Sequence, residues 1–302
     1  MSREIAELGV VAAVAAAAGL AVAWAATRRE PETSVSVIAT SPRLDEDQQQ
    51  VEYLFSQIEP WRFEATAPTI DIESRGELDA MNLNEDGAGL SIGIIQWSQG
   101  GGGMATFMEG LSRYAASAAY KHLGPLFPEV KTRVSMRDRD AREEPVGGVR
   151  LWEGVWVPRF RSLLQDPIME SLQYVLALSD DSPYFDAASD AAKMVGTTSM
   201  QDFAILFDMA VQNGPVVRRW ASRAADLPTD ARGRVRAMER MRVARFQRDS
   251  KPSSGDWRLV NGKWHRFVGR SVDLAQASIN RNAKIRAALP DRLIPGGMTA
   301  LV

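Results

Sequence analysis

Apolar residues recur every three to four positions through most of the chain after residue 100, which is the period of an amphipathic helix. This spacing predicts helices over residues 104–118, 159–179, 186–195, 199–212, 215–225, 231–249 and 270–289. Residues 90–97 are rich in apolar and β-branched side chains and predict a short buried strand. The sequence has no internal repeat, which argues against solenoids and propellers. We therefore expect an α+β fold that is mainly α-helical, with a small β segment around residues 81–97.

Residues 48–65 also carry helical spacing, and we expect Pro60 to kink or interrupt this helix. Glu64 would then lie at or just after a helix end, beside Trp61 and Phe63. The glycine run over residues 98–103 is expected to form a loop, and the charged segment 137–149 an exposed loop.

An uninterrupted apolar run of 19 residues, residues 8–26, precedes the folded part. It is just long enough to span a bilayer as a helix, although a small-residue triplet at 23–25 would also suit signal-peptide cleavage. A membrane anchor, a signal segment and a buried Ala-rich helix remain open, as does the orientation in a membrane. We therefore divide the chain into an N-terminal anchor or signal (1–30), a polar linker (31–47) and a folded domain (48–302).

The composition excludes several kinds of site. The chain has no cysteine, which rules out disulfides, thiolate zinc sites and cysteine nucleophiles. Its only histidines, His122 and His265, argue against a histidine metal cluster and a Ser-His-Asp hydrolase. The glycine run is not followed by Gly-Lys-Ser/Thr, so it is not a phosphate-binding loop. Acid-base chemistry without a metal or organic cofactor thus depends on carboxylates.

Charge is divided unevenly along the chain. Residues 41–110 hold 13 acidic residues against 3 arginines, whereas residues 211–302 hold 19 basic residues against 7 acidic ones. The two parts either neutralise each other in the fold or form the acidic and basic walls of a cleft for a charged polymer. The arginines of residues 232–248 cover several helix faces, which favours a solvated helix with one or two buried ion pairs over a nucleic-acid partner.

Two segments of the sequence resemble a known family. Residues 86–97, DGAGLSIGIIQW, resemble the active-site segment Asp-Gly-x-Gly-aromatic-Thr-x-Gly-Ile-Ile-Gly-Phe of the chitosanase and peptidoglycan-hydrolase branch of the lysozyme-like superfamily. Residues 207–214, FDMAVQNG, are similar to its Tyr-Asp-Ala-x-Val-x-His-Gly helix. The resemblance implies a two-lobed lysozyme-like domain with the β segment at the cleft.

The resemblance also implies roles for individual residues. Glu64 corresponds to the general acid, Asp86 to the general base and Ser91 to the hydroxyl residue that helps to hold the attacking water. Asp208 corresponds to the aspartate of an ion-pair network behind the acid, with Arg245 and Arg258 as its best-placed partners and Arg266 and Arg270 as substitutes. Because the spacing from Glu64 to Asp86 is longer than in typical chitosanases, Glu73 or Glu77 are alternative acids.

Such a pair of carboxylates would suit glycoside hydrolysis, because an apolar surround keeps the acid protonated while a polar turn keeps the base ionised. We expect an inverting mechanism, with substrate contacts from Gln96, Trp97, Gln212 and Asn213. A buried position in the core strand is the alternative for Trp97. The expected substrate is peptidoglycan, with chitosan as an alternative, and the expected location is the cell envelope, with membrane contact through residues 8–26. A non-catalytic wall-binding or assembly module is the competing hypothesis.

Overall fold

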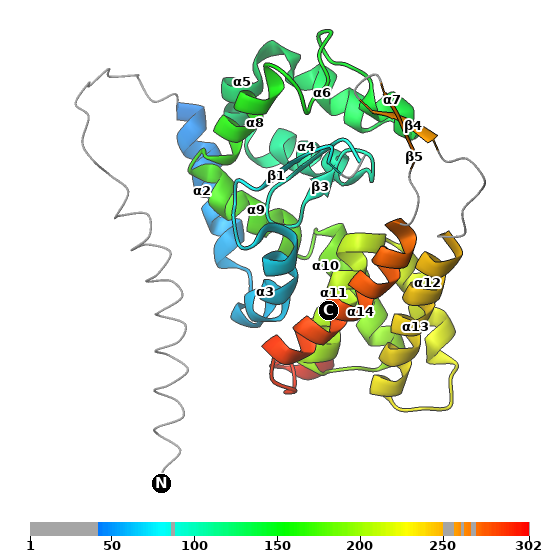
Figure 1. Ribbon diagram of the computed structural model, residues 1–302. Helices are drawn as coiled ribbons and strands as arrows, with labels where there is room; N and C mark the ends of the chain where they lie inside the picture. Colours follow the sequence, from blue (N-terminus) through cyan, green and yellow to red (C-terminus); the bar gives the residue numbers. More distant parts are fainter. Residues whose placement is uncertain (1–41, 86–87, 250–256, 261–262, 267–269, 302) are drawn as a thin grey trace. The chain divides into compact units, whose positions relative to one another are not determined.

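The computed structural model describes residues 42–85, 88–249, 257–260, 263–266 and 270–301, and within these the side chains of 42–44, 247–249, 257–274, 298 and 300 are not described. The chain divides into two units, residues 1–40 and 41–302, and every described residue lies in the second. This second unit is mainly helical with small antiparallel sheets (Figure 1), as the sequence predicts. Among the described residues, no helix is both long and apolar enough to cross a membrane. The predicted anchor, residues 8–26, lies outside the described residues.

Two helices begin the described chain, α2 (Pro42–Ser56) and α3 (Pro60–Ser74). α2 starts inside the predicted linker. The predicted interruption near Pro60 is confirmed, because α2 ends at Ser56 and Pro60 is the first residue of the separate helix α3. Proline suits this position, since the first N–H groups of a helix have no intrahelical partner. α3 continues through Pro68 and ends where Arg75 adopts a left-handed conformation, with φ of 57°. Glu64 therefore lies inside α3, and Glu73 lies at its C-terminal end.

The predicted β segment is a three-stranded antiparallel sheet of β1 (Met81–Leu83), β2 (Leu90–Ile92) and β3 (Trp97–Ser98). Asn82 pairs with Ser91, which pairs with Ser98 on the other side. The single strand predicted over residues 90–97 is instead two short strands joined by a tight turn. Gly93 starts this turn with φ of 75°, and an added Cβ would lie 2.4 Å from Gln173 Oε1, so the position requires glycine.

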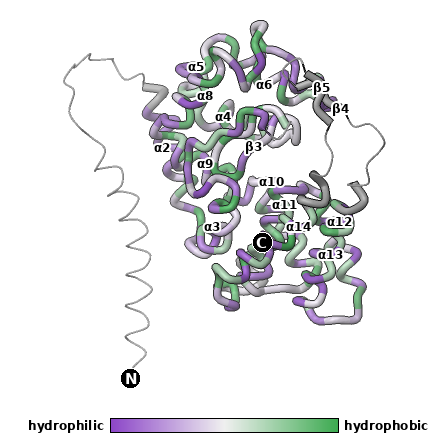
Figure 2. Tube along the Cα trace, in the orientation of Figure 1, coloured by the Kyte–Doolittle hydropathy of each residue, from purple (hydrophilic) through white to green (hydrophobic). Residues whose placement is uncertain are grey.

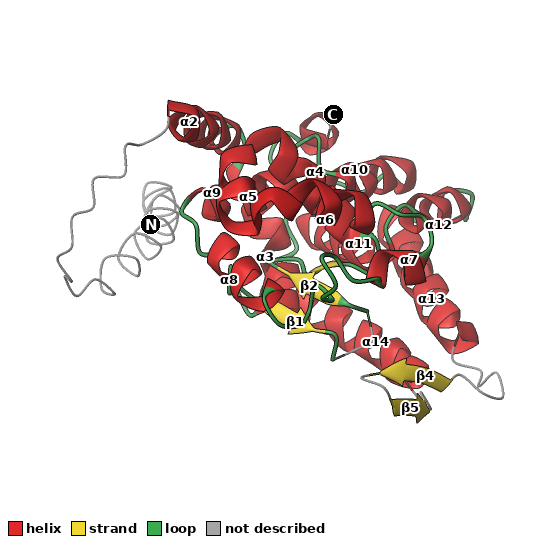
Figure 3. Cartoon of the chain, turned by 90° about the horizontal axis from the view of Figure 1, so that it is seen from above, coloured by secondary structure: helices red, strands yellow, loops and turns green. Residues whose placement is uncertain are grey.

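Helices surround the sheet. The sheet is followed in the chain by α4 (Gly103–Tyr114), α5 (Ala116–Leu123), η1 (Gly124–Leu126), α6 (Phe127–Val134), α7 (Arg139–Glu143), α8 (Trp156–Leu164) and α9 (Ile168–Leu178). The short α7 lies in the segment that was predicted to be an exposed loop. In Figure 3, β1 and β2 lie below α4, α5 and α6 in the picture, with α8 beside them.

The remaining helices are α10 (Pro183–Val195), α11 (Met200–Asn213), α12 (Val216–Ala225), α13 (Ala231–Asp249), α14 (Arg270–Ala288) and η2 (Gly297–Leu301). α10 packs on α11 and α12, α13 packs on α14, and α3 contacts both α11 and α14. A hairpin of β4 (Trp257–Val260) and β5 (Lys263–Arg266), which was not predicted, lies between α13 and α14 in the chain.

One continuous apolar core joins the helices to the sheet. Hydrophilic and hydrophobic residues alternate along the helices (Figure 2), and the hydrophobic ones supply this core. Trp61 of α3, for example, packs against Phe185 of α10 and Phe203 of α11, with ring centroids 5.7 and 5.2 Å away. α11 is buried almost throughout and carries two acidic residues in the core, Asp202 and Asp208. A buried carboxylate needs compensating partners, which makes these residues informative.

Candidate active site

Glu73 lies near the C-terminal end of α3, where that helix contacts α11 and α14. Its side chain is 15% exposed. Arg281 Nη2 of α14 donates to Glu73 Oε1 over 2.7 Å, and Gln212 Nε2 of α11 donates to the same oxygen over 3.3 Å. Both hydrogen bonds thus use Oε1 of the carboxyl group. Three helices far apart in the sequence hold this one side chain.

Behind Glu73, Asp208 lies fully buried between two guanidinium groups. Arg242 Nη1 of α13 is 2.8 Å from Asp208 Oδ2, and Arg281 Nε is 3.0 Å from Asp208 Oδ1, with a further bond from Arg281 Nη2. Arg242 is also fully buried, and its Nη2 donates to Gln212 Oε1. Gln212 therefore links Arg242 to Glu73. We call Asp208, Arg242, Arg281, Gln212 and Glu73 the acid network.

The acid network shifts its two carboxyl groups in opposite directions. Burial is the largest effect on Glu73 and raises its pKa, while Arg281 opposes this shift and Asp208 adds to it. Burial also acts most strongly on Asp208, but Arg242 and Arg281 together outweigh it and hold the pKa of Asp208 below its usual value. Asp208 is therefore the ionised member, whereas Glu73 retains a proton to higher pH. A carboxyl group that holds its proton is what a general acid requires.

Glu64, the predicted acid, has different surroundings. It lies in the early part of α3, its side chain is 39% exposed, and it forms an ion pair with Arg292. The prediction that it stands at a helix end is wrong, because α3 begins before it. The other alternative, Glu77, is exposed. Of these three glutamates, Glu73 is the one that shares an arginine, Arg281, with Asp208.

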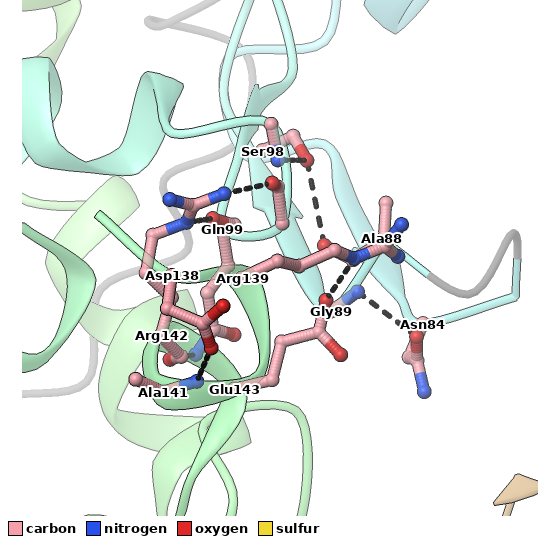
Figure 4. A network of polar contacts seen from close by, with 12 residues as sticks. Asn84, Ala88, Gly89, Ser98, Gln99, Asp138, Arg139, Ala141, Arg142 and Glu143 are labelled. Carbon is pink, nitrogen blue, oxygen red and sulfur yellow. Dashed lines mark hydrogen bonds and ion pairs between the residues drawn. The ribbon is translucent and has the colours of Figure 1, made fainter. Parts of the chain in front are cut away.

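Asp86, the predicted base, and Gly87 lie outside the described residues. The residues on either side are held by hydrogen bonds. Glu85 N donates to Asn82 Oδ1 over 2.9 Å. Gly89 N donates to Asn84 Oδ1 over 2.9 Å (Figure 4). Gly89 has φ of 73°, and an added Cβ would lie 2.8 Å from Gln99 Oε1. The connection from β1 to β2 is thus fixed at both of its described ends.

The glycine run after β3 braces the same connection. Gly100 N donates to Ala88 O over 2.7 Å, and Leu90 N donates to Gln99 Oε1 over 3.2 Å. Arg142 of α7 holds the run in turn, because its guanidinium group donates to the backbone oxygens of Gln99 and Gly100 (Figure 4). The sequence analysis missed Arg142, since nothing in a charged segment distinguishes one arginine from its neighbours.

A second brace ties the end of α3 to the sheet. Gln173 of α9 is fully buried, its Nε2 donates to Leu78 O over 2.9 Å, and its Oε1 accepts from Ile94 N over 3.0 Å. Gly93 N donates to Ala80 O over 2.8 Å in the same place. The segment leading from Glu73 to β1 is therefore attached to the turn between β2 and β3. No sequence pattern distinguishes Gln173.

The other predicted site residues lie either in the three-stranded sheet or at the end of α11. Ser91 is 4% exposed in the middle strand of the sheet, and Gln96 Nε2 donates to the backbone oxygen of Gly93 over 3.0 Å. Trp97 is 1% exposed and packs on Phe107 at 5.1 Å between ring centroids. Trp97 is therefore a core residue, which is one of the two roles that the sequence leaves open for it.

At the end of α11, Gln212 is exposed and belongs to the acid network, whereas Asn213 Nδ2 donates to Met209 O over 3.2 Å. Asp208 has the predicted role in a network of arginines. The partners of Asp208 differ from those predicted. They are Arg242 and Arg281, whereas Arg245 and Arg258 were expected. The side chains of Arg258, Arg266 and Arg270 lie outside the described residues.

The structure thus shows a buried glutamate, Glu73, with a raised pKa, and hydrogen bonds that hold the described residues on either side of positions 86 and 87. The chain matches no protein-family model, and no curated protein is significantly similar to it in sequence.

Proposed function

We propose that the chain is a glycoside hydrolase of a two-lobed, lysozyme-like type that cleaves a β-1,4-linked amino-sugar polymer. The observation that carries the proposal is the acid network. A glutamate at a helix end, with a raised pKa and hydrogen bonds from Arg281 and Gln212, suits the general acid of such an enzyme. The similarity of residues 86–97 and 207–214 to the chitosanase and peptidoglycan-hydrolase branch supports the same function.

In the proposed mechanism, Glu73 donates its proton to the glycosidic oxygen as the bond to the anomeric carbon breaks. Its Oε1 accepts the two hydrogen bonds from the acid network, so Oε2 is the oxygen that carries the proton. Asp86, assisted by the Ser91 hydroxyl group, takes a proton from the attacking water. A separation of about 6.5–9.5 Å between the two carboxyl groups leaves room for that water and gives inversion of configuration.

Peptidoglycan is the proposed substrate, because the apolar residues 8–26 would place the domain beside the cell wall as an anchored or exported protein. Chitosan is the second candidate, and a specific observation favours it. Asp71, Glu77 and Asp79 are exposed close in sequence to Glu73, and a negative surface attracts a polycation. Added salt would weaken the cleavage of chitosan more strongly if these charges attract it.

The test is release of reducing ends from purified peptidoglycan and from chitosan by the purified chain. Glu73→Gln and Asp86→Asn remove the proposed acid and base, while Glu64→Gln on the same helix is the matched control. Release that is lost in the first two variants and retained in the control supports the proposal and identifies the substrate. A folded chain that binds the wall but releases nothing from either polymer would instead favour a non-catalytic binding or assembly module.

A further inference from the structure

Three hydrogen-bonded side chains lie where α5 contacts α8, outside the acid network. Nε2 of His122, on α5, is 2.7 Å from Asp166 Oδ2, and its Nδ1 is 2.9 Å from Oγ of Ser162, on α8. The side chains of His122 and Asp166 are each 10% exposed, whereas Ser162 is exposed. A hydroxyl group, an imidazole and a carboxylate in this order are the parts of an activated serine. One histidine is enough for them, so the small number of histidines does not exclude such a site.

Asp166 is the group that orients the histidine. Burial acts to raise its pKa, but hydrogen bonds from Lys121 and His122 outweigh this effect and hold the pKa below its usual value. Lys121 Nζ is 2.8 Å from Oδ2, the same oxygen that His122 contacts, and Ile168 N donates to Oδ1 over 3.4 Å. Asp166 is therefore an ionised carboxylate, which can only accept hydrogen bonds.

The ionised Asp166 decides which nitrogen of neutral His122 carries the proton. Nε2 must donate to the carboxylate, so Nδ1 is the acceptor and Ser162 Oγ donates its hydrogen to it. In the serine proteases the two ring nitrogens have opposite places, but either nitrogen can accept a proton. A serine inside a helix can also donate to the backbone oxygen four residues earlier. The Ser162 hydroxyl group is instead directed at a base.

A positive charge lies on the same side of α8. Arg159 precedes Ser162 by three residues, a spacing that places two side chains on one face of a helix. Its Nη1 donates to Leu123 O over 3.3 Å, so Arg159 and Ser162 reach neighbouring residues at the end of α5. The Arg159 guanidinium also lies over the Trp156 ring, 5.2 Å from its centroid, which helps to hold it. N–H donors near a developing negative charge lower the barrier of acyl transfer.

We propose that Ser162 is the nucleophile of a second site, which hydrolyses carboxylic esters. Ser162 Oγ attacks the acyl carbon as its proton passes to His122 Nδ1, and Arg159 stabilises the negative charge on the carbonyl oxygen. The bond from the acyl carbon to the alcohol oxygen then breaks, and the alcohol leaves with the proton from His122. Water repeats both steps, which releases the acid and restores Ser162. Because Ser162 is exposed, the ester can belong to a larger molecule.

The test is labelling of the purified full-length chain with a fluorophosphonate, which reacts with activated serine hydroxyl groups, and location of the label by mass spectrometry. Hydrolysis of p-nitrophenyl acetate measures turnover of an ester. Ser162→Ala removes the nucleophile by changing an exposed side chain, and His122→Gln removes the base. Ser222→Ala, which changes an exposed serine of α12, is the matched control. Glu73→Gln separates this site from the proposed glycan hydrolysis.

We expect the label on Ser162, with the rates of labelling and of ester hydrolysis lowered at least about 10²-fold in His122→Gln. Asp166→Asn should lower both rates as well, because an amide can donate to Nε2 and so place the imidazole proton on Nδ1. Arg159→Gln should slow ester hydrolysis about tenfold or more. The Ser222 and Glu73 variants should behave as the native chain does. A native chain that is not labelled, a label on another residue, or unchanged rates in His122→Gln would each overturn the proposal.

Discussion

Glu64 and Glu73 lie on the same helix and have the same side chain, yet their surroundings differ completely. Glu64 pairs with Arg292 at the surface, where both side chains are more than a third exposed. Glu73 is mostly buried, receives hydrogen bonds from α11 and α14, and has its pKa raised by burial. A surface pair of the first kind contributes little to stability. Burial and a shared arginine, rather than aromatic neighbours in the sequence, distinguish the candidate acid.

The largest expected difference between the two glutamates is in the rate of hydrolysis. Glu73→Gln removes the proton donor and should lower kcat by about 10²- to 10⁴-fold, the usual range for general acid catalysis. Glu64→Gln removes only a surface ion pair and should leave kcat within about twofold of the native value. Reducing-end release under saturating substrate measures both. Similar losses of kcat in the two variants would contradict the proposal that Glu73, and not Glu64, is the proton donor.

Stability should distinguish the buried network from the surface pair almost as clearly. Asp208→Asn leaves the buried Arg242 guanidinium without its counter-charge and should lower the free energy of unfolding by about 3–5 kcal/mol. Glu64→Gln should lower it by about 0–1 kcal/mol. Urea unfolding at neutral pH gives both values. A loss below 1 kcal/mol for Asp208→Asn would mean that water or other groups compensate Arg242.

The raised pKa of Glu73 predicts a smaller, pH-dependent effect on stability. As the pH rises above the usual glutamate pKa, the unfolded chain releases this proton while the folded chain keeps it, so the native protein loses stability until the folded pKa is passed. Glu73→Gln cannot titrate. The free energy of unfolding of this variant, relative to the native chain, should therefore increase with pH across that range. Urea titrations at several pH values test this, and a difference that is constant or decreases would contradict it.

The smallest expected effect concerns Gln212. Its hydrogen bond to Glu73 lowers the pKa of that carboxyl group, against the larger effect of burial. Gln212→Ala should therefore raise the pKa of Glu73 and move the alkaline limb of the pH profile of kcat/KM to higher pH. The pH profiles of this variant and of Asn213→Ala, its neighbour on α11, make the comparison. A shift to lower pH, or the same shift in both variants, would contradict this role of Gln212.

The sequence predicts a mainly helical fold with a small sheet near residue 90, because the 3.6-residue period and the short apolar run are local patterns. The position of Glu64 relative to a helix end was predicted wrongly for a local reason, since proline can either interrupt a helix or begin one. Pro60 begins α3, and the carboxyl group near the helix end is therefore Glu73. An Asn-Gly pair at 261–262, between two apolar runs, could have predicted the β4–β5 hairpin.

Local sequence patterns could not identify the arginines that pair with Asp208. The motif in residues 207–214 indicates a buried aspartate that needs arginines, but α13 alone offers several arginines on different faces. Which of them faces Asp208 depends on how α13 and α14 pack on α11, which is tertiary structure. The role of Trp97 stayed open for a similar reason, because the sequence of a short strand does not say which face packs on α4.

Arg281, which contacts both Glu73 and Asp208, is separated from Glu73 by 208 positions in the sequence. During synthesis the glutamate therefore emerges long before its counter-charge does, and the acid network cannot close until α14 is made. We expect a nascent or C-terminally shortened chain to be inactive even if α3 and the sheet have already formed. The order of synthesis would thus keep the proposed hydrolytic activity latent until α14 has been translated.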